Sequence, residues 1–96
     1  MLVLITYDVN TETAAGRKRL RKVAKQCVDY GVRVQNSVFE CVVDNAQCRL
    51  LVHKLTDIID ETSDSLRVYY LGKKEKARIE IYGCKTAIDV AEPLIF

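Results

Sequence analysis

The first eight residues constrain the fold most, because an unbroken apolar run is followed there at once by polar side chains. Residues 2–5 read Leu-Val-Leu-Ile, without the alternation of a half-exposed strand. Such a run is typical of a strand covered on both faces and therefore central in a sheet. Thr-Tyr-Asp follows at residues 6–8, and a carboxylate held at the end of a rigid strand is well placed for chemistry. The alternative role of Asp8 is structural, in an Asx turn or a cap of the next helix.

The rest of the chain alternates between helical and strand patterns. Apolar residues recur at spacings of three and four over residues 14–30 and 44–59, which predicts two amphipathic helices. Gly31 follows the first helix, where a left-handed glycine is common. Residues 32–43 are rich in β-branched side chains and are interrupted at Asn36-Ser37, which predicts two strands. Residues 66–71 and 79–82 predict two more strands.

This order of elements predicts an α+β, ferredoxin-like βαββαβ sandwich with an additional strand, as a single domain over residues 1–96. Both helices would cover one face of the sheet and leave apolar and aromatic side chains on the other. The simplest cover for that face is a second copy, so we expect a homodimer packed through the sheets. Residues 85–96 end in Pro-Leu-Ile-Phe and are expected to form a docking tail. The tail would pack on the partner subunit, on another protein by strand addition, or on its own domain.

Composition argues against several classes of protein. No apolar stretch reaches the roughly 18 residues of a membrane span, and the N-terminus lacks the features of a signal peptide. We therefore expect a cytoplasmic protein without a membrane partner. The 4 cysteines are widely spaced, which argues against a zinc site and a disulfide framework. Three of them are expected to be small buried hydrophobes: Cys27, Cys41 and Cys48.

Positive charge is concentrated in the first predicted helix. The net charge is only +2, yet the stretch 17–25 contains basic residues and no acid. The basic residues are Arg17, Lys18, Arg19, Arg21, Lys22 and Lys25. Such a face favours nucleic-acid binding through phosphate contacts, which position the ligand without reading its sequence. Arg33 would add to these contacts.

Asp8 is the candidate for catalysis, because the sequence contains neither a Ser-His-Asp arrangement nor a glycine-rich phosphate loop. His53 is the only histidine, and its position off the apolar stripe of its helix is typical of a solvated surface residue. One carboxylate cannot hold a divalent ion firmly. Mg²⁺, however, often binds through one or two carboxylates, with water and substrate phosphate completing its octahedron. Two Asp8 side chains related by a dimer axis would supply those carboxylates. Rival functions on this fold are an RNA-recognition module, whose aromatic pattern residues 37–41 lack, and a small-molecule regulatory domain.

Several motifs, taken in order, resemble the CRISPR-associated Cas2 (Cas-two) family. They are Tyr-Asp-Val at 7–9, the basic first helix, Tyr-Gly at 30–31, Gln-Asn-Ser-Val-Phe-Glu at 35–40 and Arg-Val-Tyr-Tyr at 67–70. The resemblance implies a ferredoxin-like homodimer that acts in spacer acquisition, where it bridges dimers of the Cas1 (Cas-one) integrase and helps to hold the captured DNA duplex. It also implies a Mg²⁺-dependent endonuclease, with Mn²⁺ as a substitute ion, that cleaves double-stranded DNA or single-stranded RNA.

The resemblance also implies roles for individual residues. The metal-binding aspartate of the family matches Asp8, and Tyr7 matches another position linked with activity. Four further matching positions are Arg17, Arg19, Arg33 and Phe39, which with the helix residues Lys18, Arg21 and Lys22 make up the expected nucleic-acid surface. Two alternatives stay open: a non-catalytic, DNA-binding structural adaptor of the integration complex, and a related toxin-like ribonuclease.

Overall fold

The chain places its first strand at the centre of a five-stranded antiparallel sheet with the order β2-β3-β1-β4-β5. The computed structural model describes residues 1–71 and 78–84, and the predicted docking tail, residues 85–96, lies outside them. The elements are β1 (Leu2–Asp8), α1 (Ala14–Tyr30), β2 (Gly31–Gln35), β3 (Val38–Val42), α2 (Asn45–Ile58), β4 (Ser65–Tyr70) and β5 (Arg78–Gly83). The predicted central position of the first strand and the break between the second and third strands are confirmed.

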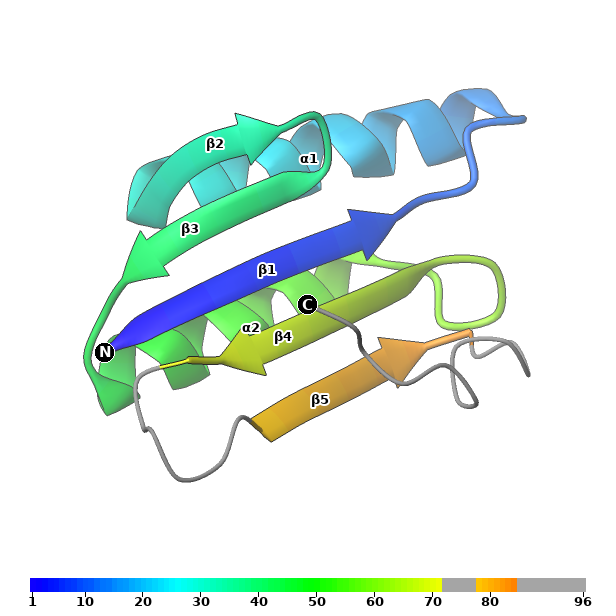
Figure 1. The fold of residues 1–96 in the computed structure, drawn as a ribbon. Coiled ribbons are helices and arrows are strands. Elements are labelled where there is room, and N and C mark those ends of the chain that lie inside the picture. The colour runs from blue at the N-terminus through cyan, green and yellow to red at the C-terminus, as the bar shows by residue number, and fades with distance from the viewer. Residues whose placement is uncertain (72–77, 85–96) are drawn as a thin grey trace.

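Both helices lie on the same face of the sheet (Figure 1). The helix α1 starts at the N-cap Thr13, whose side chain accepts a hydrogen bond from the Gly16 N–H. The helix α2 starts with a reciprocal capping box between Asp44 and Gln47. Neither helix of the described residues combines the length and hydropathy that a bilayer span requires. This arrangement is the predicted ferredoxin-like fold, with β5 added at the edge beside β4.

The core lies between the sheet and the two helices. Side chains alternate along each strand, so every second residue of β1, β3 and β4 points toward the helices. The fully buried strand residues on this side are Val3, Ile5, Phe39, Cys41, Leu66 and Val68. Cys27, Cys41 and Cys48 are buried free thiols, as predicted. One face of the sheet is therefore covered within a single chain.

The opposite face of the sheet carries apolar side chains that neither helix covers. Val32 and Val42 are exposed there on β2 and β3, and Val42 is 79% accessible. Leu2 and Leu4 lie on the same side of β1, opposite Val42 and Glu40 of β3. We call this surface the open sheet face. It is the surface through which the sequence predicts a homodimer.

Gly31 does not adopt the predicted left-handed conformation. Its φ is −161°, which is extended backbone, and β2 begins at this residue without an intervening loop. A Cβ at this position would collide with the Glu40 carbonyl oxygen and the Cys41 Sγ on β3. Glycine is needed here because β2 passes very close to β3. Gly31 does cap α1, since its N–H donates to the Cys27 carbonyl oxygen, but the expected left-handed conformation is wrong.

Candidate active site and nucleic-acid surface

Asp8 ends β1 with its side chain on the open sheet face. It pairs in register with Ser65, the first residue of β4, and it is exposed. Within residues 1–71 and 78–84 the Asp8 carboxylate makes no hydrogen bond or ion pair, and Thr13 caps the following helix. The structure therefore offers no capping or turn role for Asp8. A free carboxylate at the end of a central strand is an available ligand.

Tyr7 points in the opposite direction, toward the helices. Its side chain is only 5% accessible, and its ring stacks on Phe39 with 6.1 Å between centroids. Burial raises the pKa of the Tyr7 hydroxyl, the nearby Cys27 adds to this effect, and Arg33 partly offsets it. Successive residues of a strand face opposite sides of the sheet, so the structure does not bring Tyr7 and Asp8 together as a catalytic pair.

Phe39 is fully buried on β3. The Arg33 guanidinium lies over its ring, 5.2 Å from the centroid, and is itself exposed on β2. The expectation that Phe39 contacts nucleic acid is therefore corrected, because a ring without accessible surface cannot stack on a base. Its ring contacts the Arg33 guanidinium from β2 and the Tyr7 ring from β1.

The basic residues of α1 divide into an exposed group and one inward-facing residue. The exposed group consists of Arg17, Lys18, Arg21, Lys22 and Lys25. Arg17 Nη1 donates to the Thr11 carbonyl oxygen at 3.1 Å, which holds it against the loop after β1. This helix begins where the loop from β1 ends, so its first turns lie at the Asp8 end of the sheet (Figure 1). The predicted positive face and the candidate carboxylate therefore share one end of the domain.

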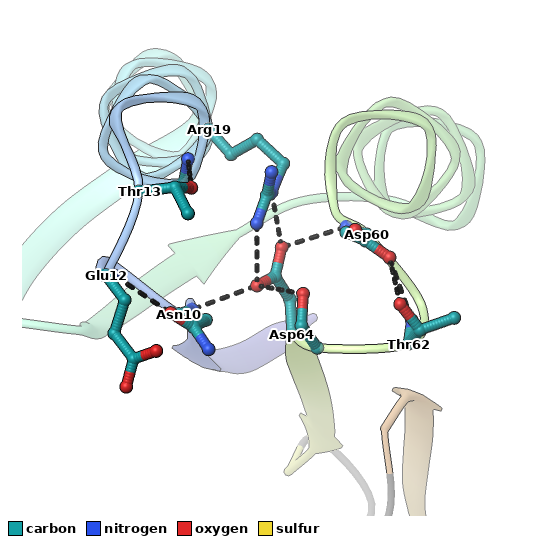
Figure 2. Close-up of polar contacts among 9 residues, drawn as sticks. Asn10, Glu12, Thr13, Arg19, Asp60, Thr62 and Asp64 are labelled. Atoms are coloured by element: carbon teal, nitrogen blue, oxygen red, sulfur yellow. Dashed lines mark hydrogen bonds and ion pairs between the residues drawn. The ribbon is translucent and has the colours of Figure 1, made fainter.

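Arg19 is the inward-facing residue, and Figure 2 shows its guanidinium turned toward Asp64. Its Nε donates to Asp64 Oδ2 at 2.8 Å and its Nη2 to Oδ1 at 3.4 Å. The Arg19 side chain retains 21% of its accessible surface, whereas that of Asp64 retains none. The structure thus separates Arg19 from the exposed basic residues with which the sequence groups it.

Asp64 is a residue that sequence analysis did not single out. Besides Arg19, it accepts hydrogen bonds from the Asn10 N–H at 2.9 Å and the Asp60 N–H at 2.8 Å. Burial alone would raise its pKa, but the hydrogen bonds from Arg19 and the two backbone amides outweigh burial and lower it. The only local signal for this role is its position immediately before a strand, within a segment that reads as a polar connection.

Within the described part of the chain, no group of three or more His, Cys, Asp or Glu side chains is arranged to hold a metal ion. Asp8 offers hard carboxylate oxygens, which suit Mg²⁺ or Mn²⁺, but it supplies one ligand group only. One Asp8 carboxylate from each chain fits an ion that is shared between two chains, with water and phosphate completing its coordination shell. The described residues of one subunit do not fit a closed site.

Comparisons with known proteins agree with this architecture. The sequence matches the family model described as CRISPR associated protein Cas2 over residues 1–79. It is 59% identical over 96 residues to a CRISPR-associated endonuclease Cas2 of Halalkalibacterium halodurans, with all of both chains covered. It is 57% identical to the CRISPR-associated endoribonuclease Cas2 1 of Moorella thermoacetica, with 99% of each chain covered. The crystal structure of Streptococcus pyogenes Cas2 at pH 6.5 superposes with a TM-score of 0.71 and 69% identity, over 77% of this chain and 89% of that one. The chain therefore belongs to the Cas2 family of CRISPR-associated proteins.

Proposed function

We propose that this protein is a homodimeric, Mg²⁺-dependent endonuclease of CRISPR spacer acquisition that cleaves phosphodiester bonds of double-stranded DNA or single-stranded RNA. The observation that carries the proposal is the exposed Asp8 carboxylate, which has no partner among the described residues and lies on the open sheet face. The names of the relatives, endonuclease and endoribonuclease, support a nuclease role.

The apolar side chains of the open sheet face support the proposed dimer. Burying exposed residues such as Val32 and Val42 against a second copy stabilises the assembly by roughly 25 cal/mol for each Å² of apolar surface removed from water. Asp8 lies on the same face, so a twofold axis near the end of β1 would bring two carboxylates together. The twofold arrangement supplies the second ligand group that one chain lacks.

In this proposal the residues of the chain divide the work. The two Asp8 carboxylates would hold Mg²⁺, or Mn²⁺ in its place, and such an ion would supply the activation of water and the stabilisation of negative charge on the phosphate. Exposed basic side chains hold the nucleic-acid backbone at the same end of the domain: Arg17, Lys18, Arg21, Lys22 and Arg33. Because their partners are phosphates, binding depends on salt rather than on base sequence.

We place the dimer in the cytoplasm, where it bridges the Cas1 integrase and holds the captured duplex. The docking of residues 85–96 onto that partner or onto the second subunit belongs to the same proposal. Both roles are compatible with one molecule, because the exposed basic residues of α1 would hold the duplex in either role, whether or not Asp8 takes part in cleavage.

The deciding experiment is a cleavage assay on matched DNA and RNA substrates, in Mg²⁺, in Mn²⁺ and in chelator. It compares wild type with Asp8→Asn and with Asp57→Asn, which removes the same charge from an exposed position on α2. We expect ion-dependent cleavage by wild type and Asp57→Asn, and a loss of at least about 100-fold in Asp8→Asn. Cleavage by Asp8→Asn at the wild-type rate, or a monomeric wild-type protein in sedimentation equilibrium, would refute the proposal.

Loss of cleavage must be separated from loss of binding. Duplex binding by all three proteins is therefore measured over a range of salt concentrations, and the affinity should fall steeply as salt rises. A wild-type dimer that binds duplex and supports integration but cuts neither substrate in either ion is the non-catalytic adaptor. A salt-independent affinity would remove α1 from the nucleic-acid surface.

A further inference from the structure

We propose that the ion pair between the buried Asp64 and the partly exposed Arg19 is a positioning device for Asp8, and that Arg19 acts through it and not by contacting nucleic acid. This inference rests on the proposed function, since it concerns the residues that place the metal-binding carboxylate. It assigns a role to Asp64, and it changes the role of an arginine that the sequence groups with the phosphate-binding residues.

Two neighbouring residues, Asp64 and Ser65, hold the chain at Asp8 and just beyond it. Ser65 pairs in register with Asp8 itself. The Asp64 carboxylate accepts the N–H of Asn10, which lies just beyond Asp8 in the loop that leaves β1. The direction in which the chain leaves Asp8 is therefore set by the same short segment that ends the strand pairing. Figure 2 shows the loop, α1 and the connection before β4 converging on this carboxylate.

Arg19 keeps the Asp64 carboxylate in place. The carboxylate is fully buried, so it needs a full set of donors, and the fork of the guanidinium supplies two of them. The Asp60 N–H supplies another at 2.8 Å. Without Arg19, a buried charge would lack its counter-ion and the carboxylate would turn toward solvent. The Asn10 N–H would then lose its acceptor.

The close packing of the loop leads to the same conclusion. A Cβ at Gly16, in the first turn of α1, would collide with the Asn10 carbonyl oxygen. The Asn10 peptide is thus held from one side by the helix backbone and from the other by Asp64. Since Arg19 belongs to the same helix, the ion pair holds the helix and the loop together at the point where the loop leaves Asp8.

The test separates an arginine that positions Asp8 from an arginine that binds phosphate. The variants are Asp64→Asn, Arg19→Gln, Arg19→Lys and the double variant Arg19→Gln/Asp64→Asn, with Arg21→Gln as the matched loss of one exposed charge from α1. The first readout needs no activity: the amide signals of Asp8 and Asn10 are followed by NMR, with hydrogen exchange and with a Mg²⁺ titration. The second readout is nucleic-acid affinity as a function of salt, and the third is cleavage at saturating substrate.

We expect Asp64→Asn and Arg19→Gln to shift the Asp8 amide signal, to speed exchange at Asn10 and to weaken Mg²⁺ binding by about 10-fold or more, the usual effect of removing a residue that orients a metal ligand. Cleavage at saturating substrate should fall by a similar factor. Mg²⁺ affinity and cleavage in the double variant should be no lower than in the more impaired single variant, because both substitutions break the same ion pair. Nucleic-acid affinity and its salt dependence should stay within about twofold of wild type, whereas Arg21→Gln should lower the salt slope by about one.

Two results would overturn the inference. One is a salt slope lowered in Arg19→Gln as it is in Arg21→Gln, with full recovery in Arg19→Lys, because a lysine can replace a phosphate-binding charge but not a two-donor fork. The other is an unchanged Asp8 signal and Mg²⁺ affinity in the variants. If Asp64→Asn does not fold, Arg19→Lys carries the same comparison. If wild type neither binds Mg²⁺ nor cleaves, the proposed function fails, while the amide signals of Asp8 and Asn10 still decide whether the ion pair positions them.

Discussion

Replacing Phe39 by leucine tests whether this ring supports the fold or contacts nucleic acid. The ring is fully buried, stacks on Tyr7 at 6.1 Å and lies under Arg33 at 5.2 Å. Truncation of a buried Phe to Ala costs about 3–5 kcal/mol, and leucine retains part of that packing. The aromatic pair contributes a further ~0.5–1.5 kcal/mol and the cation–π contact ~0.5–1 kcal/mol, both of which leucine loses.

These contributions together give an expected loss of roughly 2–4 kcal/mol in the free energy of unfolding. Native domains have a free energy of unfolding of only about 5–15 kcal/mol, so the variant should stay folded but lose much of its stability. At about 4–8 °C per kcal/mol for a domain of this size, Tm should fall by roughly 8–32 °C. Nucleic-acid binding measured well below Tm should change little, because the Phe39 ring has no solvent-accessible surface that could contact a ligand.

Urea titration at a fixed protein concentration measures the loss, since a dimer makes stability depend on concentration. The matched control is Val28→Ala on α1, where the side chain is 57% accessible and the change should stay within about 0.5 kcal/mol. The reasoning is refuted if Phe39→Leu unfolds at the wild-type urea concentration and yet loses nucleic-acid binding. That combination would mean that the ring is exposed in solution.

Three further predictions follow from individual groups. The pKa of Asp64 lies below its ordinary 3.8, so the stability that this carboxylate contributes is complete above about pH 4 and is lost as pH falls through its pKa in the folded protein. Asp64→Asn should therefore flatten the acidic part of a curve of unfolding free energy against pH, and an unchanged curve in that range would contradict the assignment. Burial raises the pKa of Cys27 to about 12 and that of Cys41 to about 11, and only thiolates react readily. Ellman's reagent at pH 8 should therefore label the half-exposed Cys84 first and the two buried thiols only on unfolding. Rapid labelling of all three thiols would contradict the burial of Cys27 and Cys41. Gly31→Ala should lower the free energy of unfolding by about 1–3 kcal/mol in the same urea assay, because the new methyl group would collide with the β3 backbone and the Cys41 Sγ. An increase in stability, as Gly→Ala often gives at unstrained positions, would contradict the close approach of β2 to β3.

Much of the architecture can be predicted from local patterns. The apolar run of residues 2–5 predicts the central strand, and two runs of helical periodicity predict α1 and α2 close to their observed bounds. The Asp44–Gln47 capping box is visible in the sequence because its partners are three residues apart. The period of two along a strand also places Tyr7 and Asp8 on opposite faces, although the family resemblance linked both positions with activity.

What only the tertiary structure decides are the pairings between residues that are distant in the chain. Arg19 and Asp64 are 45 positions apart, and no periodicity relates a basic helix to a polar connection before a strand. The burial of Phe39 and the close approach of β2 to β3 at Gly31 likewise depend on where the helices and strands pack. The physical reason is that periodicity and capping act over a few residues, whereas the partner of a buried charge is set by the packing of the whole domain. The sequence by itself therefore determined the elements and the exposed carboxylate at the end of β1, and the packing decided which of its arginines remain free to meet a phosphate.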